Sequence, residues 1–306
     1  MTASPLQIVL RVSGLVKSFG EVRAVDGLSL EVRRGEIFGF LGPNGAGKTT
    51  TIKLMCGLLR PDGGTIAVDG SIGLSPQTIM IWETLTPFEQ LVFIGRVHGL
   101  DRRTSVRRAE VLVEAFGLRE KRNKLARTLS GGMQRRLNIA LALVHKPEVL
   151  LLDEPQAGLD PQSRVLVRDH IRALAPKTTV VLTTHDMEEA EKLSDRVCII
   201  DRGKVLVLDT VSNIKAGVGS GDIIEIGTGE TGPEPVVAVL RELGAEGSKV
   251  SVRGRLVTAV SPAASNLLAG FLPIARDRGL HPDHVRIRQI TLEDAFLNLT
   301  GRGLRE

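Results

Sequence analysis

Three runs of consecutive apolar residues mark the first two thirds of the chain. They span Ile37 to Leu41, Val149 to Leu152 and Val180 to Thr184. Runs of this length without polar alternation are typical of strands buried on both faces of a parallel sheet. Behind the first run, apolar residues at positions 52, 55 and 59 have helical spacing. The pattern therefore predicts an α/β fold built on a parallel sheet.

Capping and turn residues indicate where the remaining helices and strands begin and end. Thr86-Pro-Phe-Glu89 has the N-cap, first-turn proline and capping-box glutamate of a helix start, and Gly117 closes a second helix. The segment from about residue 87 to 146 is therefore expected to be a helical subdomain. Further strands are predicted at Ile8 to Val16, Val25 to Val32, Thr65 to Val68, Ser71 to Leu74, Val197 to Ile200 and Lys204 to Leu208.

The pattern changes near Gly219. From there the order is strand, helix, strand, strand, helix, strand, which suits a small α+β domain of the ferredoxin-like type, and a last amphipathic helix follows at Thr291 to Thr300. We therefore expect two domains, residues 1–214 and 215–306. The predicted elements are Ile223 to Ile226, Pro235 to Leu243, Lys249 to Val252, Leu256 to Val260, Ala263 to Arg278 and His284 to Ile290.

Length and composition agree with a two-domain globular protein of 306 residues and 42% apolar content. No run approaches the roughly 18 apolar residues of a membrane span, and the first ten residues lack a signal-peptide pattern. We expect a cytosolic, soluble chain. Cys56 and Cys198 lie in apolar contexts, which favours buried packing residues over a redox pair.

The net charge of +5 is unevenly distributed. Residues 89–146 hold 13 basic and 5 acidic residues, whereas residues 210–306 hold 11 of each. The basic segment is either a solvated helical surface or a face near anionic lipid headgroups. A nucleic-acid partner is not expected, because the segment has few aromatic residues for base stacking and no known reading module.

The stretch Gly42-Pro-Asn-Gly-Ala-Gly-Lys-Thr-Thr50 fits G-x-x-x-x-G-K-[ST] between a predicted strand and a predicted helix. Glycines let backbone N–H groups close around phosphate oxygens, and a helix N-terminus supplies a positive dipole. Lys48 is expected to reach the β- and γ-phosphates, and the Thr49 hydroxyl to ligate Mg²⁺. The motif predicts binding of a nucleoside triphosphate.

Two carboxylates end the second apolar run. Asp153 and Glu154 would be costly at the mouth of a buried strand unless they have a ligand or partner. Asp153 suits Mg²⁺ bound through water, and Glu154 suits a general base that orients an attacking water.

Other candidates are ambiguous on their own residues. Ser130 with two glycines at a helix start is either a second anion site or a simple cap. Gln77 reads as a loop residue, and Phe19 in a predicted turn either packs in the core or stacks on an adenine. The apolar Ile79 to Trp82 stretch is either core or a docking surface. His281 and His284 lack further ligands nearby for a metal site.

Taken together, these motifs resemble the ATP-binding subunit of ABC transporters over roughly residues 6 to 210. The resemblance is carried by Leu129-Ser-Gly-Gly-Met-Gln134, placed between the phosphate loop and the strand with two carboxylates. It implies a P-loop NTPase core that binds and hydrolyses ATP with Mg²⁺. It also implies that Phe19 stacks on adenine, that Gln77 and His185 join the catalytic Lys48 and Glu154, and that Gln77 shares the Mg²⁺ with Thr49 and Asp153. The nucleotide-contacting residues carried over are Phe19, Gly42, Pro43, Asn44, Gly45, Ala46, Gly47, Lys48, Thr49, Thr50, Ser130, Gly131, Gly132, Gln134 and Asp160.

Within that family, the single nucleotide domain and the ending at residues 292–301 look like ABC-2 type exporter ATPases, including the daunorubicin-resistance branch. This likeness implies a homodimer with two composite sites and a separate membrane permease, on the cytoplasmic face of the membrane. Residues 215–306 would then be an accessory or dimerisation domain. Met133 follows the two glycines where Gln is common, and Gln156 and Phe19 replace a commoner Thr and Tyr, but no catalytic group is lost.

Two rival interpretations share the same core chemistry. A non-transport ABC ATPase acting on nucleic acid or ribosomes usually carries tandem nucleotide domains or long coiled coils, and this sequence has neither. An import ATPase is disfavoured only by the likeness of the C-terminal extension to exporters.

Overall fold

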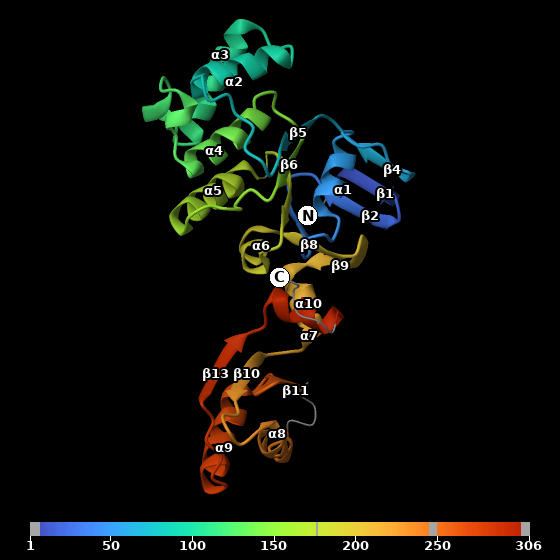
Figure 1. Cartoon of the computed structure of the whole chain (residues 1–306), viewed down its shortest axis with the longest axis vertical. Helices are drawn as coiled ribbons and strands as arrows, with labels where there is room; N and C mark the ends of the chain where they lie inside the picture. The colour runs from blue at the N-terminus through green and yellow to red at the C-terminus, as the bar shows by residue number, and fades with distance from the viewer. Residues whose placement is uncertain (1–6, 176, 245–249, 301–306) are drawn as a thin grey trace, which may run out of the picture. The chain divides into compact units, whose positions relative to one another are not determined.

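The computed structural model describes residues 7–175, 177–244 and 250–300, and the chain divides into two compact units (Figure 1). The border falls between Val211 and Ser212. Lys249, predicted to begin a strand, and Gly301, at the end of the exporter-like ending, lie outside the described residues. No helix in the described ranges is long and apolar enough to cross a membrane.

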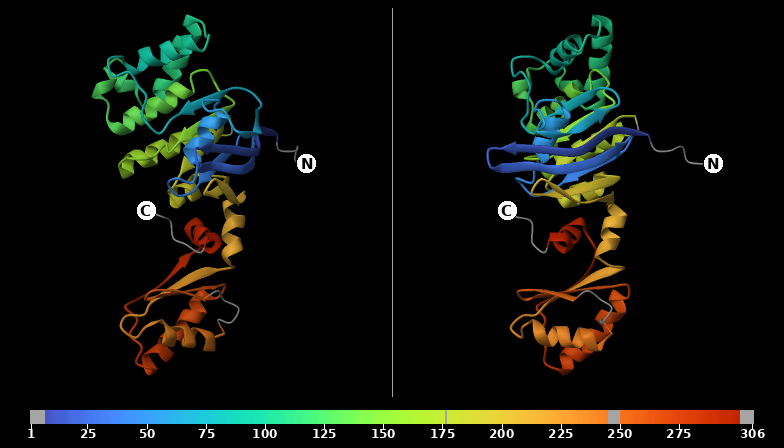
Figure 2. Two further views of the ribbon diagram at one scale, coloured as in Figure 1. Left: turned by 45° about the vertical axis from the view of Figure 1, so that its right-hand side comes forward. Right: turned by 90° about the vertical axis from the view of Figure 1, so that its right-hand side faces the viewer.

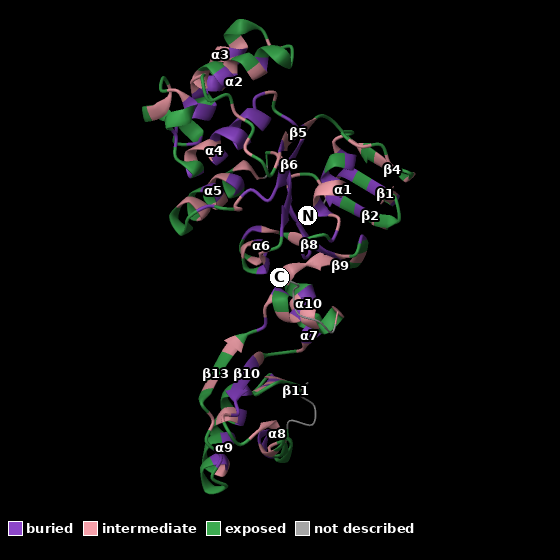
Figure 3. Ribbon diagram, in the orientation of Figure 1, coloured by how far each residue is buried: buried purple, intermediate pink, exposed green. Residues whose placement is uncertain are grey.

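A six-stranded sheet forms the centre of the first unit. Its strand order is β5-β6-β7-β3-β8-β9, parallel except for the last pair. The three long apolar runs form β3, β6 and β7, whose residues are all buried, as the purple ribbon shows (Figure 3). The strands are β3 Ile37–Leu41, β5 Ile72–Ser75, β6 Val149–Asp153, β7 Thr179–Thr184, β8 Arg196–Asp201 and β9 Lys204–Thr210.

The carboxyl ends of the central strands meet at one edge of this sheet. Leu41 at the end of β3 lies opposite Thr184 of β7, and Thr183 lies opposite Asp153 at the end of β6. Because the phosphate loop follows β3 and the paired carboxylates end β6, the topology brings both motifs together.

A second, antiparallel sheet of the order β2-β1-β4 packs on the same core. It consists of β1 Ile8–Phe19, β2 Val22–Arg33 and β4 Gly63–Val68, and its long hairpin is the dark blue ribbon in Figure 2. The strands run further than predicted. Phe19 therefore ends a strand, paired with Val22, and the prediction that it lies in the turn is wrong.

Helices α1 to α6 complete the described part of the first unit. The helix start predicted at Thr86 is confirmed, because its hydroxyl accepts from the Glu89 N–H while the Glu89 carboxylate accepts from the Thr86 N–H. Gly117 follows the second helix of the subdomain with φ of +61°. The helices are α1 Lys48–Met55, α2 Pro87–Val97, α3 Arg102–Ala115, α4 Gly131–Ala142, α5 Pro161–Leu174 and α6 Met187–Leu193, with 3₁₀ turns η1 Arg119–Lys121 and η2 Ala126–Thr128.

Both cysteines are packing residues of this unit. Cys198 is buried in β8, and Cys56 lies half-buried against the same core. Burial raises the pKa of each thiol to about 12. Such thiols are unreactive near neutral pH.

The second unit has the strand and helix order expected from the sequence. Its antiparallel sheet runs β11-β12-β10-β13, the arrangement of a split βαβ fold. Helices α8 and α9 cover one face through apolar residues such as Val239 and Phe271. A short helix at the border, α7, was not predicted. The elements are α7 Val211–Val218, β10 Asp222–Gly227, α8 Pro233–Glu242, β11 Val250–Arg253, β12 Leu256–Ser261, α9 Ala264–Asp277, β13 His284–Gln289 and α10 Leu292–Thr300.

Candidate functional site: a phosphate-binding loop with two carboxylates

The loop between β3 and α1 needs glycine at two positions for different reasons. A Cβ at Gly42 would lie 2.3 Å from the Ile200 carbonyl oxygen, so this glycine permits close backbone packing. Gly47 has φ of +103°, and a Cβ there would lie 2.3 Å from the Ala24 carbonyl oxygen. Gly45 also has positive φ, but its Cβ position is open. The loop is thus fixed against the protein while its middle remains accessible to a ligand.

Lys48 begins α1, and its side chain is only 5% exposed. It donates to the carbonyl oxygens of Gly42 at 2.8 Å and Pro43 at 3.2 Å, and lies 3.6 Å from a Glu154 oxygen. Burial lowers the pKa of Lys48, and the neighbouring carboxylates of Glu154 and Asp153 partly oppose that shift. A buried cation held against its own loop is a strong partner for phosphate oxygens.

The carboxylate of Asp153 connects the end of β6 with α1 and β7. Its Oδ1 accepts from the Thr183 hydroxyl at 2.6 Å and from the Thr49 hydroxyl at 3.3 Å. A carboxylate and a hydroxyl that meet beside a phosphate loop form the oxygen donor set that Mg²⁺ prefers. The residues present therefore fit the metal expected from the sequence.

Glu154 is the central acid of the site. Its φ of +47° is left-handed, which costs a non-glycine residue roughly 1–2 kcal/mol and turns the side chain off the strand axis. Its Oε1 lies 3.1 Å from His185 Nδ1 and its Oε2 accepts from Gln77 Nε2 at 3.5 Å, while its N–H donates to the Thr183 hydroxyl at 2.9 Å. The backbone strain places one carboxylate within reach of Lys48, His185 and Gln77.

Sequence reasoning missed the side chains that support this cluster. Buried Arg135 of α4 donates to the carbonyl oxygens of Pro76 at 3.1 Å and Gln77 at 2.8 Å. Asn138, one turn later, accepts from the Met80 N–H at 3.1 Å. The sequence pattern that could have revealed them is a pair of polar residues one helical turn apart on the buried side of an amphipathic helix. Both hold the segment that carries Gln77.

The aromatic ring of Phe19 lies 49% exposed at the end of β1. Lys17 Nζ is 5.7 Å from the ring centroid. This exposure removes core packing as the role of the ring and leaves a face accessible to a ligand.

Two further predicted residues begin helices away from the acid cluster. Ser130 caps α4 by accepting from the Met133 N–H at 3.3 Å, and Asp160 caps α5 by accepting from the Ser163 N–H at 3.0 Å. A Cβ at Gly132 would lie 2.4 Å from Ser163 Oγ, so the two helix starts pack closely. In the described ranges, neither Ser130 nor Asp160 bonds to the phosphate loop or to Glu154.

The remaining predicted residues line these same two places. Asn44 is exposed, Ala46 is buried and Thr50 is half-buried in the loop and its helix, while Gly131 and Gln134 follow Ser130. The Gln134 N–H donates to the Ser130 carbonyl at 2.8 Å as a first-turn helix bond. The structure therefore brings Lys48, Thr49, Gln77, Asp153, Glu154 and His185 into one cluster.

A glycine loop at a helix start, a buried lysine, a hydroxyl–carboxylate pair and a strained glutamate define a P-loop nucleoside triphosphatase. The comparisons with known proteins narrow this class. The sequence profile described as "ABC transporter" matches residues 25–157.

Curated relatives match nearly the whole chain. The daunorubicin resistance ATP-binding protein DrrA3 of Streptomyces coeruleorubidus is 40% identical, over 95% of this chain and 96% of its own. The linearmycin resistance ATP-binding protein LnrL of Bacillus subtilis is 37% identical, over 97% of this chain and 100% of its own. A solved ATP-binding subunit of an ABC transporter superimposes with a TM-score of 0.61 at 28% identity, covering 68% of this chain and 92% of that chain.

The chain belongs to the ATP-binding subunits of ABC transporters. Its fold and family make it an ATPase with exporter-type relatives, as the sequence predicted.

Proposed function

We propose that two copies of this chain work as a dimer that drives export through a separate ABC-2 type permease, with ATP sandwiched at each of two shared sites. The proposal rests on one observation: within one chain, the predicted site residues form two separate groups. The phosphate loop and its acids form one cluster, whereas Ser130 and Asp160 begin helices that make no bond to it among the described residues. A second copy, facing the first, would supply the missing contacts.

Each group of the cluster then has a distinct role. Lys48 and the loop N–H groups hold the phosphates, and Phe19 stacks on the adenine. Thr49, Asp153 and Gln77 would hold Mg²⁺, which neutralises developing phosphate charge when bound. Glu154 orients the attacking water and accepts its proton, and His185, 3.1 Å from that carboxylate, contacts the γ-phosphate.

The dimer closes because ATP binds the closed state more tightly than the open one. A ligand shifts an equilibrium only by its differential affinity for the two states. ATP contacts Ser130 and Asp160 of the second copy only when the copies meet. Loss of the γ-phosphate removes that difference, so the copies separate.

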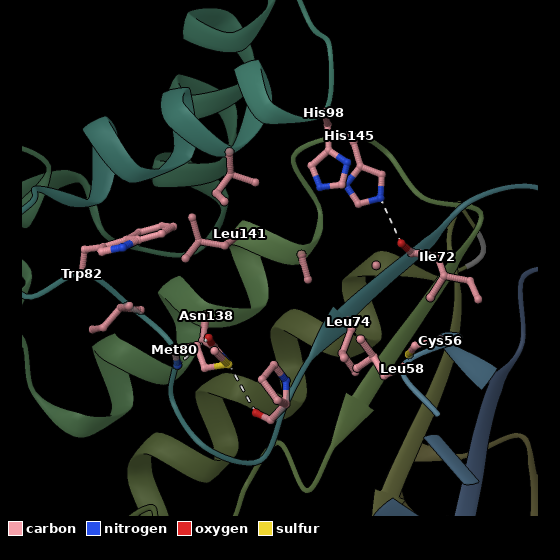
Figure 4. Close-up of a pocket in the computed structure, with 15 residues that line it drawn as sticks. Cys56, Leu58, Ile72, Leu74, Met80, Trp82, His98, Asn138, Leu141 and His145 are labelled. Carbon is pink, nitrogen blue, oxygen red and sulfur yellow. Dashed lines mark hydrogen bonds between the residues drawn. The ribbon is translucent and has the colours of Figure 1, made fainter. Parts of the chain in front are cut away.

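A groove beside Gln77 is the proposed docking place for the permease. It encloses about 600 Å³ between β5, α2 and α4, and its lining is mostly apolar (Figure 4). Trp82 and Met80 stand at its wall with 43% and 67% of their surfaces exposed. Arg135 and Asn138 hydrogen-bond to the segment that carries both Gln77 and this wall. A movement at the nucleotide site would therefore reach a permease helix bound in the groove.

The dimer is tested by replacing Glu154 with Gln. The variant should lose ATP turnover by roughly 10²- to 10⁴-fold, the usual contribution of a general base. Bound MgATP should then hold it as a dimer in size-exclusion chromatography with multi-angle light scattering. Glu188→Gln, which removes an exposed carboxylate that pairs with Lys192, is the control and should keep wild-type behaviour. A Glu154→Gln protein that stays monomeric in saturating MgATP, with or without permease, contradicts the proposal.

The docking groove is tested by Trp82→Ala. The indole contacts Phe93 edge-on at 5.5 Å and is partly exposed, so its loss should leave basal ATP hydrolysis unchanged and abolish stimulation by permease in proteoliposomes. A parallel fall in basal turnover would show that Trp82 is a core residue instead.

A further inference from the structure

A cluster of cations covers the corner where α2 meets α3 beside the end of α4. Arg108 fixes this corner, because its guanidinium donates to the carbonyl oxygens of Val144 at 3.0 Å and Leu143 at 2.7 Å. Arg108 is half-buried, and the other cations of the cluster are exposed. We call the following residues the basic corner: Arg96, Arg102, Arg103, Arg107, Arg108 and Lys146.

The acids near the corner are already engaged. Asp101 accepts from the Thr104 N–H and hydroxyl, and Glu148 accepts from Ser71. Further along α3, Glu114 pairs with Arg119 and Glu110 pairs with Arg122. In the part of the chain that the structure describes, Arg102, Arg103 and Arg107 therefore have no ion-pair partner.

These three arginines are also badly placed for the helix itself. Two begin α3, where the helix dipole is positive, and the first turn holds no acidic residue. Arg103 and Arg107 are one turn apart and repel each other. The N-cap carboxylate of Asp101 offsets part of this charge, and the excess that remains suits an external anionic partner.

Apolar groups interrupt the charges. Val97, in the last turn of α2, is 64% exposed, and Phe93 one turn earlier is 50% exposed. Next to Val97, His98 stacks on His145 with ring centroids 3.9 Å apart, and both rings line the apolar groove (Figure 4). The basic corner therefore borders the groove, although none of its six residues lines it.

We infer that the basic corner rests on anionic lipid headgroups of the membrane that holds the permease. The inference builds on the proposed docking groove, because a surface beside a membrane-protein socket faces the bilayer. Long exposed cations around an isolated apolar side chain suit the interface of a fluid anionic bilayer, where charge attraction and shallow insertion act together. An acidic protein segment is the competing partner.

The test is vesicle flotation of the full chain without permease. Wild type should bind vesicles of phosphatidylcholine mixed with phosphatidylglycerol and not vesicles of phosphatidylcholine alone. The triple variant Arg102→Gln, Arg103→Gln, Arg107→Gln should bind roughly a hundredfold more weakly, because each surface charge contributes roughly fivefold. Raising NaCl from about 0.1 M to about 0.5 M should release wild type, because screening shortens the reach of these charges.

A matched control separates local from total charge. Arg241→Gln, Arg255→Gln and Arg276→Gln remove three exposed arginines of the second unit and should leave vesicle binding unchanged. Basal ATP hydrolysis should be the same in wild type and in both triple variants. A failure of the membrane inference can therefore be told apart from a failure of the proposed dimer. Equal vesicle binding by both triple variants overturns the inference. Membrane binding that requires permease and is lost only in the corner variant also overturns it, and assigns the corner to an acidic segment of that permease.

Discussion

Each unit of the chain contains a group of inward-facing charges, and the two groups are built differently. At the phosphate loop, Lys48 lies 3.6 Å from Glu154, and Thr49 lies 3.3 Å from Asp153. In the second unit, Arg288 contacts Glu225 at 2.6 Å and grips both oxygens of Asp294 at 2.6 and 2.8 Å. Arg286 adds a further close contact to Glu225.

The pKa directions follow this geometry. Burial alone would raise the pKa of Glu225 and of Asp294. Hydrogen bonds from Arg286 and Arg288 to Glu225, and from Arg288 and Thr291 to Asp294, outweigh it and leave the pKa of both carboxyls below the ordinary range. At the phosphate loop, burial prevails and lowers the pKa of Lys48 despite two nearby carboxylates. Charges that satisfy one another hold a fold together, whereas loosely paired buried charges have capacity left for a ligand.

The largest effect should come from Lys48→Ala. Loss of a buried charged donor to phosphate should reduce kcat/KM for ATP by roughly three orders of magnitude or more, through weaker binding and a less stabilised transition state. Thermal stability should change little, because the ion pair with Glu154 is long, at 3.6 Å, and the two hydrogen bonds of the ammonium go to carbonyl oxygens of its own loop. Lys53→Ala, an exposed lysine on the same helix, is the control and should keep wild-type activity in a coupled ATPase assay. A large loss of stability with retained MgATP affinity would show that Lys48 stabilises the fold and does not bind the nucleotide.

Arg288→Met should show the opposite profile. Removing the arginine leaves Asp294 without its main partner and Glu225 with Arg286 alone, and it should destabilise the second unit by about 2–4 kcal/mol. Basal ATP hydrolysis should remain. Arg286→Met, whose side chain is 64% exposed, should cost less. Chemical denaturation followed by hydrogen exchange in β10 and β13 measures the difference, and equal losses in both variants would refute the assigned hierarchy.

The smallest expected difference between the two groups of charges is in how pH affects them. Because the folded pKa values of Glu225 and Asp294 lie below the references of 4.5 and 3.8, their stabilisation is present above those values. It is lost as pH falls below about 4 through the depressed values. Affinity for MgATP should instead fall on the alkaline side, before pH reaches the 10.5 reference of lysine, because the pKa of Lys48 is lowered. Unfolding experiments across pH measure the loss of stability, and nucleotide titrations across pH measure the affinity for MgATP. An affinity that does not change up to pH 10.5 would contradict the prediction for Lys48.

The phosphate site could be predicted from sequence because its parts are local motifs placed by a simple topology. The residues at 42–50 and the acids at 153 and 154 each follow an apolar run, and parallel strands bring the ends of such runs together. The capping box at Thr86 and the order of the second unit were predictable for the same reason, since short-range patterns specify them.

What could not be predicted depends on pairing between distant segments. The residues around Glu225 do not predict that β13 will place Arg286 opposite it and bring Arg288 into hydrogen-bond contact with its carboxylate. The left-handed backbone of Glu154 is equally hidden, because glutamate has no preference for it. The glycine next to Phe19 favours a turn there, yet pairing with β2 carries the strand through Phe19.

The close fit of Gly132 against Ser163 has a mechanical consequence. Gly132, the second residue of α4, packs against Ser163, the third residue of α5, so neither helix start can tilt alone and Ser130 and Asp160 move together. A methyl group at Gly132 would push the two helix starts apart, shifting two contact points far apart in sequence in a single stroke.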